Sequence, residues 1–175
     1  IYLLGETRDE LGGGEYLKML AKNIHPAQKG TPQEGNNVPK VNLEKNLKTY
    51  QALEKAIQKE LVASSLSVTS GGLGIALAKA CVGGMLGCKI SLNSIGQNLR
   101  IDAKLFSESQ GRILISVSPK NIKEFEKMCI GISYAKLGKT EKNGKIKIND
   151  SRKKIVETNV QKLHKIYHRF SNSMK

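Results

Sequence analysis

Short apolar runs alternate with amphipathic stretches along most of the chain. Apolar runs bounded by polar or glycine residues predict buried strands, because they are too short for buried helices. Four such runs span residues 1–4, 62–68, 88–92 and 112–117. The run at 112–117 is a strong candidate for a central strand of a sheet.

Helices are predicted where apolar residues recur at spacings of three and four. Residues 42–61 give the clearest pattern, and Asn42 is placed to cap this helix at its N-terminus. A helix rich in alanine and glycine is expected to open at residues 71–72 and to end at residues 83–84. Three shorter helices are predicted at 16–21, at 101–106 and from Pro119. The segment 101–106 also fits an extended conformation.

The last part of the chain is expected to hold a hairpin and a helix. Asn143 followed by Gly144 is the strongest hairpin signal in the sequence, so residues 132–137 and 145–148 are expected to pair. Asp150 or Ser151 is then expected to begin a final amphipathic helix. Its inward residues would be Ile155, Val160, Leu163, Tyr167 and Phe170.

Strands and helices therefore alternate, with hairpin elements among them. This order favours an α/β (α+β) fold in which helices cover a mixed sheet. The length of 175 residues suits one domain. We expect a glycine-rich loop and connection over 1–41, a core over 42–137, and a basic hairpin and helix over 138–175. Three of the four prolines make 24–41 an irregular connection.

The net charge of +14 raises the question of nucleic-acid binding. Residues 1–118 carry 14 basic and 10 acidic groups, whereas residues 119–175 carry 15 basic and 5 acidic groups. This excess is nearly all lysine on predicted helix faces and turns, which is typical of a solvated surface. Aromatic residues make up only 5% of the chain, without the basic–aromatic pattern of an RNA-binding sheet. The pattern disfavours nucleic-acid binding.

The sequence shows no membrane-spanning segment, no signal peptide and no cysteine motif. The most apolar segment, 73–85, is interrupted by Lys79 and is too short to span a bilayer. No signal peptide is recognisable, so we expect a cytoplasmic protein without a membrane partner. The first residue is Ile1 and not methionine, so we expect either a processed chain or a piece of a longer protein. Cys81, Cys88 and Cys129 form no metal or disulfide motif and are expected to be buried apolar residues.

Three segments are candidates for binding a phosphorylated ligand. Glycines let backbone N–H groups approach an oxyanion, a helix N-terminus attracts negative charge, and an arginine can clamp a phosphate. Ordinary turns and solvated loops are the alternatives for each segment. The candidate residues are Arg8, Gly12, Gly13, Thr69, Ser70, Gly71, Gly72, Ser107, Glu108, Ser109, Gln110, Gly111 and Arg112.

Catalytic and metal-ligating side chains are not evident in the sequence. His164 and His168 lie four residues apart on a predicted helix, but no third ligand accompanies them. No serine–histidine–aspartate or cysteine–histidine pattern stands out. We therefore predict no catalytic residue and no metal site within this chain.

The same three segments carry a resemblance to a known family. Residues 5–17 (GETRDELGGGEYL), 69–78 (TSGGLGIALA) and 105–117 (LFSESQGRILISV) are similar, in the same order, to three elements of phosphoribosylformylglycinamidine synthase. The resemblance covers residues 1 to about 137. The chain looks like the C-terminal lobe of the second half of the large synthetase component, and thereby resembles the C-terminal domain of aminoimidazole ribonucleotide synthetase, whose sheet is partly ferredoxin-like.

The resemblance implies a carbon–nitrogen ligase of purine biosynthesis. Members use ATP, Mg²⁺ and glutamine-derived ammonia to convert formylglycinamide ribonucleotide to its amidine. The implied partners are an N-terminal synthetase lobe of the same chain and a glutaminase component. The isolated lobe is expected to be inactive, to need no cofactor, and to be capable of forming a homodimer through a face the missing lobe would cover.

One departure from the family pattern leaves a second interpretation open. The family has a histidine and an aspartate where this chain has Leu66 and Ser67, and an acidic residue where it has Ser70. This chain therefore lacks the acids that would hold Mg²⁺ at these positions in the family. A non-catalytic scaffold or interaction domain of the same superfamily is the alternative, and a basic nucleic-acid-binding module is a weaker one.

Overall fold

The structure is a computed structural model that describes residues 1–23 and 37–172. Most of the connection predicted at 24–41 lies outside the described residues. The order of elements is β1 (Tyr2–Leu4), α1 (Glu15–Asn23), α2 (Leu43–Gln58), β2 (Val62–Ser67), α3 (Gly72–Gly84), β3 (Gly87–Ser91), α4 (Ile101–Phe106), β4 (Ile113–Val117), η2 (Pro119–Asn121), α5 (Ile122–Met128), β5 (Tyr134–Lys136), β6 (Gly138–Glu141), β7 (Lys145–Asp150), β8 (Lys153–Asn159) and α6 (Val160–Asn172). The four strands predicted from apolar runs are confirmed as β1, β2, β3 and β4.

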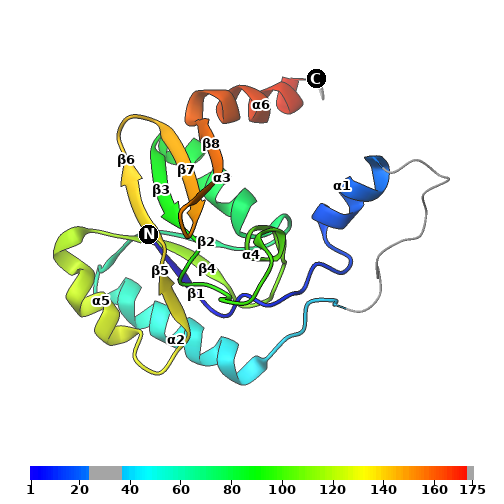
Figure 1. The fold of residues 1–175 in the computed structure, drawn as a ribbon. Coiled ribbons are helices and arrows are strands. Elements are labelled where there is room, and N and C mark those ends of the chain that lie inside the picture. Colours follow the sequence, from blue (N-terminus) through cyan, green and yellow to red (C-terminus); the bar gives the residue numbers. More distant parts are fainter. Residues whose placement is uncertain (24–36, 173–175) are drawn as a thin grey trace.

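The first sheet has the strand order β2-β4-β1-β5, and every neighbouring pair is antiparallel. Helix α2 lies in the connection from β1 to β2, and α5 lies in the connection from β4 to β5. Two interlocked β-α-β units of this kind make a ferredoxin-like sheet. Both helices cover one face of it (Figure 1). The α+β fold with a ferredoxin-like part is therefore confirmed.

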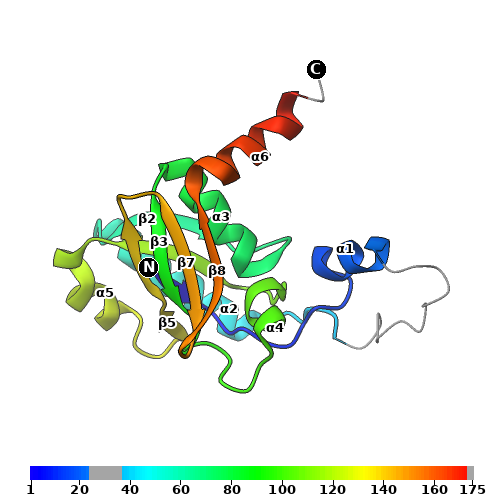
Figure 2. The same ribbon diagram turned by 45° about the horizontal axis from the view of Figure 1, so that its top comes forward.

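The second sheet packs against the other face of the first sheet, with α3 beside it. Its order is β6-β3-β7-β8, with β3 and β7 parallel and the other pairs antiparallel. Figure 2 shows β3, β7 and β8 side by side, with α3 close to them. Because successive strand residues point to opposite faces, the strand residue Leu3 joins this core, whereas Tyr2 and Leu4 join the core under α2 and α5.

The hairpin predicted around Asn143 and Gly144 is wrong. Residues 134–136 form β5, which pairs with β1 in the first sheet, whereas β7 lies in the second sheet between β3 and β8. The strand directly before Asn143 is β6, and it does not pair with β7 either, because β3 lies between them and pairs with both. The hairpin that forms joins β7 to β8 through a turn in which Ser151 has a positive φ of 54°. The turn chemistry of Asn143–Gly144 thus produces a tight reversal, and tertiary pairing decides which strands become neighbours.

The start predicted for the last helix is also wrong. Residues 153–159 form β8, and α6 begins only at Val160, which is fully buried. Ile155 and Val156 are β-branched and pack from β8 against the core. Of the predicted inward residues, Leu163 contacts the core, Tyr167 is exposed, and the side chain of Phe170 lies outside the described residues.

Helix α2 forms as predicted and begins at its expected cap. The Asn42 side chain accepts a hydrogen bond from the Lys45 N–H at 3.0 Å. Its core-facing residues are Thr49, Leu53 and Ala56. The apolar residues that mark the helix in the sequence are largely exposed: Leu43, Leu47, Tyr50 and Ile57.

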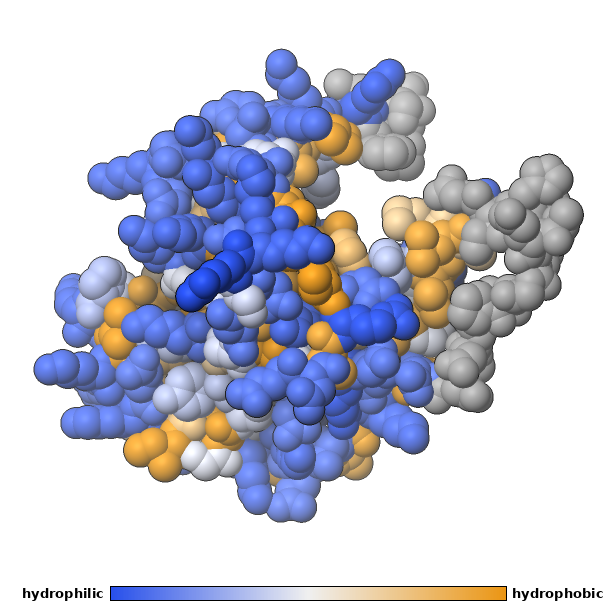
Figure 3. Space-filling model, viewed as in Figure 1, coloured by the Kyte–Doolittle hydropathy of each residue, from blue (hydrophilic) through white to orange (hydrophobic). Residues whose placement is uncertain are grey.

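The surface is mostly hydrophilic, as the lysine content leads one to expect. Figure 3 shows apolar side chains gathered in a few places, including the face of α1 that looks toward the body of the protein. None of the described helices is both long and apolar enough to cross a lipid bilayer. The three cysteines are free and buried, as predicted.

Candidate functional site

Two of the three candidate segments, 69–72 and 107–112, meet at one end of the first sheet. The Gly71 N–H at the start of α3 donates to the Glu108 carboxylate at 2.8 Å. The Val68 N–H donates to the Arg112 carbonyl at 2.9 Å, which continues the pairing of β2 with β4. Because these strands are neighbours, the turns at their ends lie together. Segments 69–72 and 107–112 therefore lie together at this end of the sheet.

The glycine-rich loop after β1 joins the same cluster. The Glu15 N–H donates to Glu108 Oε1 at 2.9 Å, and the Glu108 N–H donates to the Glu10 carbonyl at 3.1 Å. The Arg8 N–H donates to Ser109 Oγ at 3.1 Å. The three segments that carried the family resemblance are thus bonded to one another.

Gly72 is required where α3 meets the loop before β4. Its φ is +64°, in the left-handed region that favours glycine. A Cβ added there would lie 2.6 Å from the Ser107 carbonyl oxygen and 2.7 Å from the Leu105 carbonyl oxygen. The close approach of two backbones, not a ligand, explains a glycine at this position.

Glu108 bridges the N-termini of two helices. One carboxylate oxygen accepts from Gly71, which precedes α3, and from Glu15, the first residue of α1. Helix N-termini carry partial positive charge and unsatisfied N–H groups, so a carboxylate is favourable there. Glu108 occupies the position that an anion would take at either helix. A phosphate can bind these amides only by displacing it.

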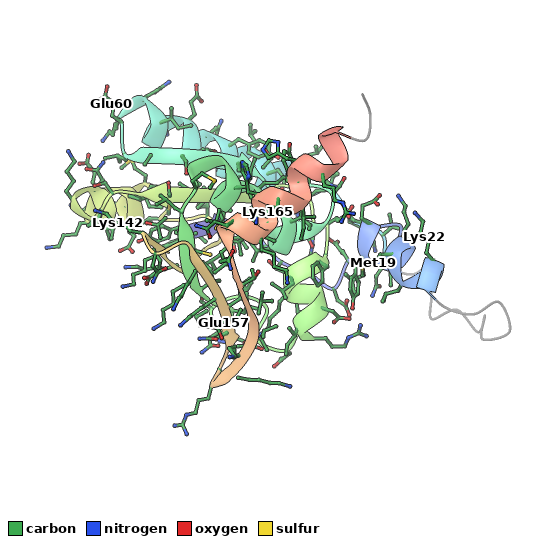
Figure 4. All side chains as sticks on the ribbon, turned by 90° about the horizontal axis from the view of Figure 1, so that it is seen from above. Met19, Lys22, Glu60, Lys142, Glu157 and Lys165 are labelled. Carbon is green, nitrogen blue, oxygen red and sulfur yellow. The ribbon has the colours of Figure 1, made fainter. Side chains whose placement is uncertain are left out.

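Helix α1 is attached to the body through this bridge and through a ring stack. The rings of Tyr16 and Phe106 lie 4.8 Å apart between centroids and are nearly parallel, at 8°. Beyond them α1 stands away from the sheets, with Met19 and Lys22 farther out (Figure 4). Both the Glu108 bridge and the ring stack lie at the first turn of α1.

Arg112 lies inside the cluster and not on its surface. Only 1% of the residue is exposed. Its guanidinium donates to the Ser109 carbonyl at 3.1 Å, to Thr7 Oγ1 at 3.1 Å, and to the Ser107 carbonyl. Burial lowers the pKa of Arg112 to about 10, partly offset by the negative charge of Glu10. In this structure Arg112 organises the loop and does not face a ligand.

Arg8 and Glu10 tie the glycine-rich loop to the segment before α2. Arg8 Nε lies 3.1 Å from Glu10 Oε1, which also accepts from the Lys40 N–H at 3.1 Å. Arg8 Nη2 donates to the Lys40 carbonyl at 2.6 Å. Since 34% of the Arg8 side chain is exposed, part of its guanidinium faces solvent. The Gly12 N–H donates to the Asn37 carbonyl at 3.0 Å.

The candidate residues therefore divide by exposure. Gly12, Gly71, Gly72, Ser107, Ser109 and Arg112 are buried, and Arg8, Glu108 and Gly111 are partly buried. The exposed residues are Gly13, Thr69, Ser70 and Gln110. Among all of these, only the partly buried and exposed residues are placed to touch a ligand.

A hollow of about 320 Å³ lies beside Arg8 and Gln110. Its other walls come largely from the first turns of α2 and from residues 131–133 before β5, and the sequence analysis assigned neither segment to a site. Lys45, whose amine is 2.7 Å from Glu6, and Asn46 are among them. These segments approach the loop only through tertiary packing, so no local pattern could have found them.

Over the residues that the structure describes, no set of side chains is arranged to hold a metal ion. No cluster of three or more histidine, cysteine, aspartate or glutamate residues occurs over 1–23 and 37–172. The rings of His164 and His168 lie 4.2 Å apart on α6 without a third ligand.

The interlocked β-α-β units, the second sheet and the glycine-rich cluster define an α+β synthetase-type lobe. The family model described as AIR synthase related protein, C-terminal domain, matches residues 1–151. The chain belongs to this family.

Two similar relatives and one solved structure with this fold carry the name of the same enzyme. The chain is 35% identical over 170 residues to phosphoribosylformylglycinamidine synthase subunit PurL of Methanocaldococcus jannaschii, covering 96% of this chain and 21% of that protein. It is 39% identical over 128 residues to PurL of Caldanaerobacter subterraneus, covering 73% of this chain and 16% of that protein. The structure of T. maritima PurL complexed with FGAR superposes with a TM-score of 0.75 at 17% identity, covering 93% of this chain and 27% of that one. The chain thus spans about a fifth of the curated relatives' length.

Proposed function

We propose that this chain is the C-terminal lobe of an ATP-dependent phosphoribosylformylglycinamidine synthase and forms one wall of its nucleotide or substrate cleft. Family membership and the relatives named PurL support the class of enzyme. One observation carries the location of the cleft: three segments far apart in the sequence are joined through the Glu108 carboxylate at one end of the first sheet.

The proposed reaction uses ATP to phosphorylate the amide oxygen of formylglycinamide ribonucleotide, and ammonia then displaces the phosphate. Structures of T. maritima PurL are described as complexed with ATP and with FGAR, which supports both ligands. A T. maritima structure named PurLQS supports a glutaminase component as partner. This lobe contributes binding groups: hydroxyls of Thr69 and Ser70, the Gln110 amide and the Arg8 guanidinium.

The described residues do not fit a Mg²⁺ site of their own. Glu10 is buried beside Arg8, Glu15 is paired with Lys18 at 2.8 Å, and Glu108 accepts from two backbone amides. We therefore assign Mg²⁺ to acidic residues of an N-terminal lobe of the same protein, which we propose as the first partner of this chain. By itself the lobe is proposed to be inactive and to bind ATP weakly, since half of the cleft is missing.

A non-catalytic lobe of the same superfamily is the second candidate. Leu66 and Ser67 stand where the family has a histidine and an aspartate, and Leu66 packs against the core shared by the two sheets. An apolar side chain at this point favours a structural role over ligand contact.

Calorimetry on the full-length protein separates these candidates. ATP with Mg²⁺ and formylglycinamide ribonucleotide are titrated into the unmodified protein and into Gln110→Ala and Arg8→Ala. Loss of one hydrogen bond to a charged ligand group costs about 1.5–3 kcal/mol, so each affected ligand should bind about tenfold or more weakly. Lys142→Ala, on the turn after β6 (Figure 4), is the control and should bind normally. Absence of binding by the unmodified protein would favour the scaffold.

Self-association of the isolated chain is proposed to use the exposed side of α2. Leu43, Leu47, Tyr50 and Ile57 follow one stripe and are 47–79% exposed. A helix with such a stripe packs readily against a second copy of itself. Sedimentation of the isolated chain should show a dimer that Leu47→Glu abolishes. A monomer at all concentrations would contradict this.

A further inference from the structure

Two buried thiols face each other where α3 turns into β3. The sulfur atoms of Cys81 and Cys88 lie 3.6 Å apart, although the residues are separated by seven positions. Met85 ends α3 in the left-handed conformation, and the Leu86 N–H donates back to the Cys81 carbonyl at 3.1 Å. This reversal folds the last turn of the helix onto the start of the strand and brings the sulfurs together.

The thiol pair lies in the wall of an apolar groove. The groove has a volume of about 520 Å³ and is lined by α3, by the turn after it and by strands β2 and β4. Both cysteines belong to its lining. Cys81 is 6% exposed and Cys88 is 1% exposed, so Cys81 is the less deeply buried residue of the pair. A small reagent that enters the groove therefore reaches Cys81 first.

We propose that Cys81 and Cys88 form a redox-modified pair that closes an intramolecular disulfide when a low-molecular-weight disulfide oxidises it. The Cys81 thiolate attacks one sulfur of the reagent, the reagent S–S bond breaks, and one reagent thiolate leaves. Cys88 gives its proton to that thiolate and attacks the Cys81 sulfur. The second reagent thiolate leaves and takes up from solvent the proton that Cys81 lost when it ionised. Two cysteine thiols are oxidised and one reagent disulfide is reduced to two thiols.

The surroundings of the sulfurs agree with this order of events. Contact with the Cys88 thiol lowers the pKa of Cys81, and contact with Cys81 together with burial raises the pKa of Cys88. The more exposed thiol is thus also the more easily ionised one. A disulfide has an S–S length of about 2.05 Å, so the sulfurs must approach by roughly 1.5 Å. There is open space beside the last turn of α3, since a Cβ added at Gly83 would meet nothing within 4 Å.

Cys129 provides an internal control. It lies in the other core, beside Phe125 and under α5, and burial raises its pKa to about 11. That cluster contains no second cysteine with which Cys129 could form a disulfide. If the folded chain reacts through the groove, Cys129 should stay reduced while the pair is oxidised.

Tryptic mapping tests the proposal directly. Cleavage after Lys79 and Lys89 releases both paired cysteines in the peptide 80–89, and Cys129 falls in 128–136. The folded chain is treated with oxidised glutathione, acid-quenched, alkylated in denaturant and digested. Peptide 80–89 should lack two hydrogen atoms and carry no alkyl group, whereas Cys129 should be alkylated. Peroxide is avoided because Met85 lies in the same peptide.

Variants establish the order of attack. Cys88→Ser should stop at a glutathione mixed disulfide on Cys81, and Cys81→Ser should react at neither position. Cys129→Ser should behave like the unmodified chain, and circular dichroism checks that each variant is folded. The proposal is overturned if peptide 80–89 of the folded, unmodified chain stays fully alkylatable at glutathione ratios that oxidise a small dithiol. Oxidation of Cys129 at the same rate would also overturn it, since only global unfolding exposes both cores.

Discussion

Replacing Glu108 with alanine should loosen the whole cluster and lower the stability of the lobe. The substitution removes the acceptor of two backbone N–H groups, at 2.8 Å from Gly71 and 2.9 Å from Glu15. A hydrogen bond to a charged group contributes about 1.5–3 kcal/mol when it is buried, and far less when water replaces it. The Gly71 bond is part-buried and the Glu15 bond is exposed. We therefore expect Glu108→Ala to lower the free energy of unfolding by about 2 kcal/mol.

Glu108→Gln separates charge from hydrogen bonding at the same position. The amide oxygen can still accept from Gly71, but the negative charge at the two helix N-termini is lost, so a loss of about 1 kcal/mol is expected. Urea unfolding followed by circular dichroism measures both variants, because the chain has no tryptophan. For a chain of this size, 2 kcal/mol corresponds to a fall in Tm of roughly 4–8 °C.

Glu54→Ala, on the exposed side of α2, is the control for removal of a surface carboxylate. It should change the free energy of unfolding by less than about 0.5 kcal/mol. Equal stability of Glu108→Ala and this control would refute the idea that Glu108 holds the three segments together. A selective loss of α1 protection in hydrogen exchange, with the rest of the lobe unchanged, would instead confirm that the bridge fixes α1.

Three further predictions concern the buried residues Arg112, Gly72 and Tyr2. Arg112→Ala should lower the free energy of unfolding, measured with urea, by about 3 kcal/mol or more, because it leaves buried carbonyl oxygens without donors. Arg112→Lys should lower it by less, because lysine can replace only some of these hydrogen bonds. Gly72→Ala should destabilise the fold by about 2 kcal/mol or more, whereas Gly83→Ala, where an added Cβ meets nothing within 4 Å, should stabilise α3 by about 0.5–1 kcal/mol. Burial, with the hydrogen bond to Glu126, raises the pKa of Tyr2. The neutral Tyr2 side chain therefore adds to the free energy of unfolding below about pH 10, and this stabilisation is lost as pH rises above the pKa of an unfolded tyrosine. Unfolding midpoints between about pH 9 and 11 should therefore fall less steeply for Tyr2→Phe than for the unmodified chain.

Sequence patterns identified most elements of this fold, and failed where long-range pairing decides. The apolar runs found β1, β2, β3 and β4 because a buried strand needs apolar residues wherever it pairs. Asn143–Gly144 gave a turn of the expected kind, but no local signal shows that β3 lies between the strands it separates. The segment 153–159 fits a helical spacing and a strand equally well, and pairing with β7 selects the strand.

Exposure was harder to predict than secondary structure. In α2 the conspicuous apolar stripe is exposed, whereas Thr49 and Ala56 face the core because α2 lies close to the sheet and to α5. Arg112 looks like a phosphate ligand in the sequence, since arginine beside a serine-rich turn usually faces outward. It is buried because the loop 107–111 wraps around the guanidinium and supplies carbonyl acceptors to it. No sequence pattern predicts these backbone acceptors.

The position of Glu108 limits how the proposed cleft can hold a phosphate. At the amides of Gly71 and Glu15, a bound phosphate would compete with a carboxylate that is covalently attached and already in place. The phosphate-contacting groups of this lobe should therefore be those not used in the bridge, namely the exposed hydroxyls of Thr69 and Ser70, the amide of Gln110 and the partly exposed guanidinium of Arg8. In the full-length protein, Glu108→Gln should then change ligand affinity less than Gln110→Ala does. The reverse order would mean that the ligand displaces the bridge, and that release of α1 accompanies binding.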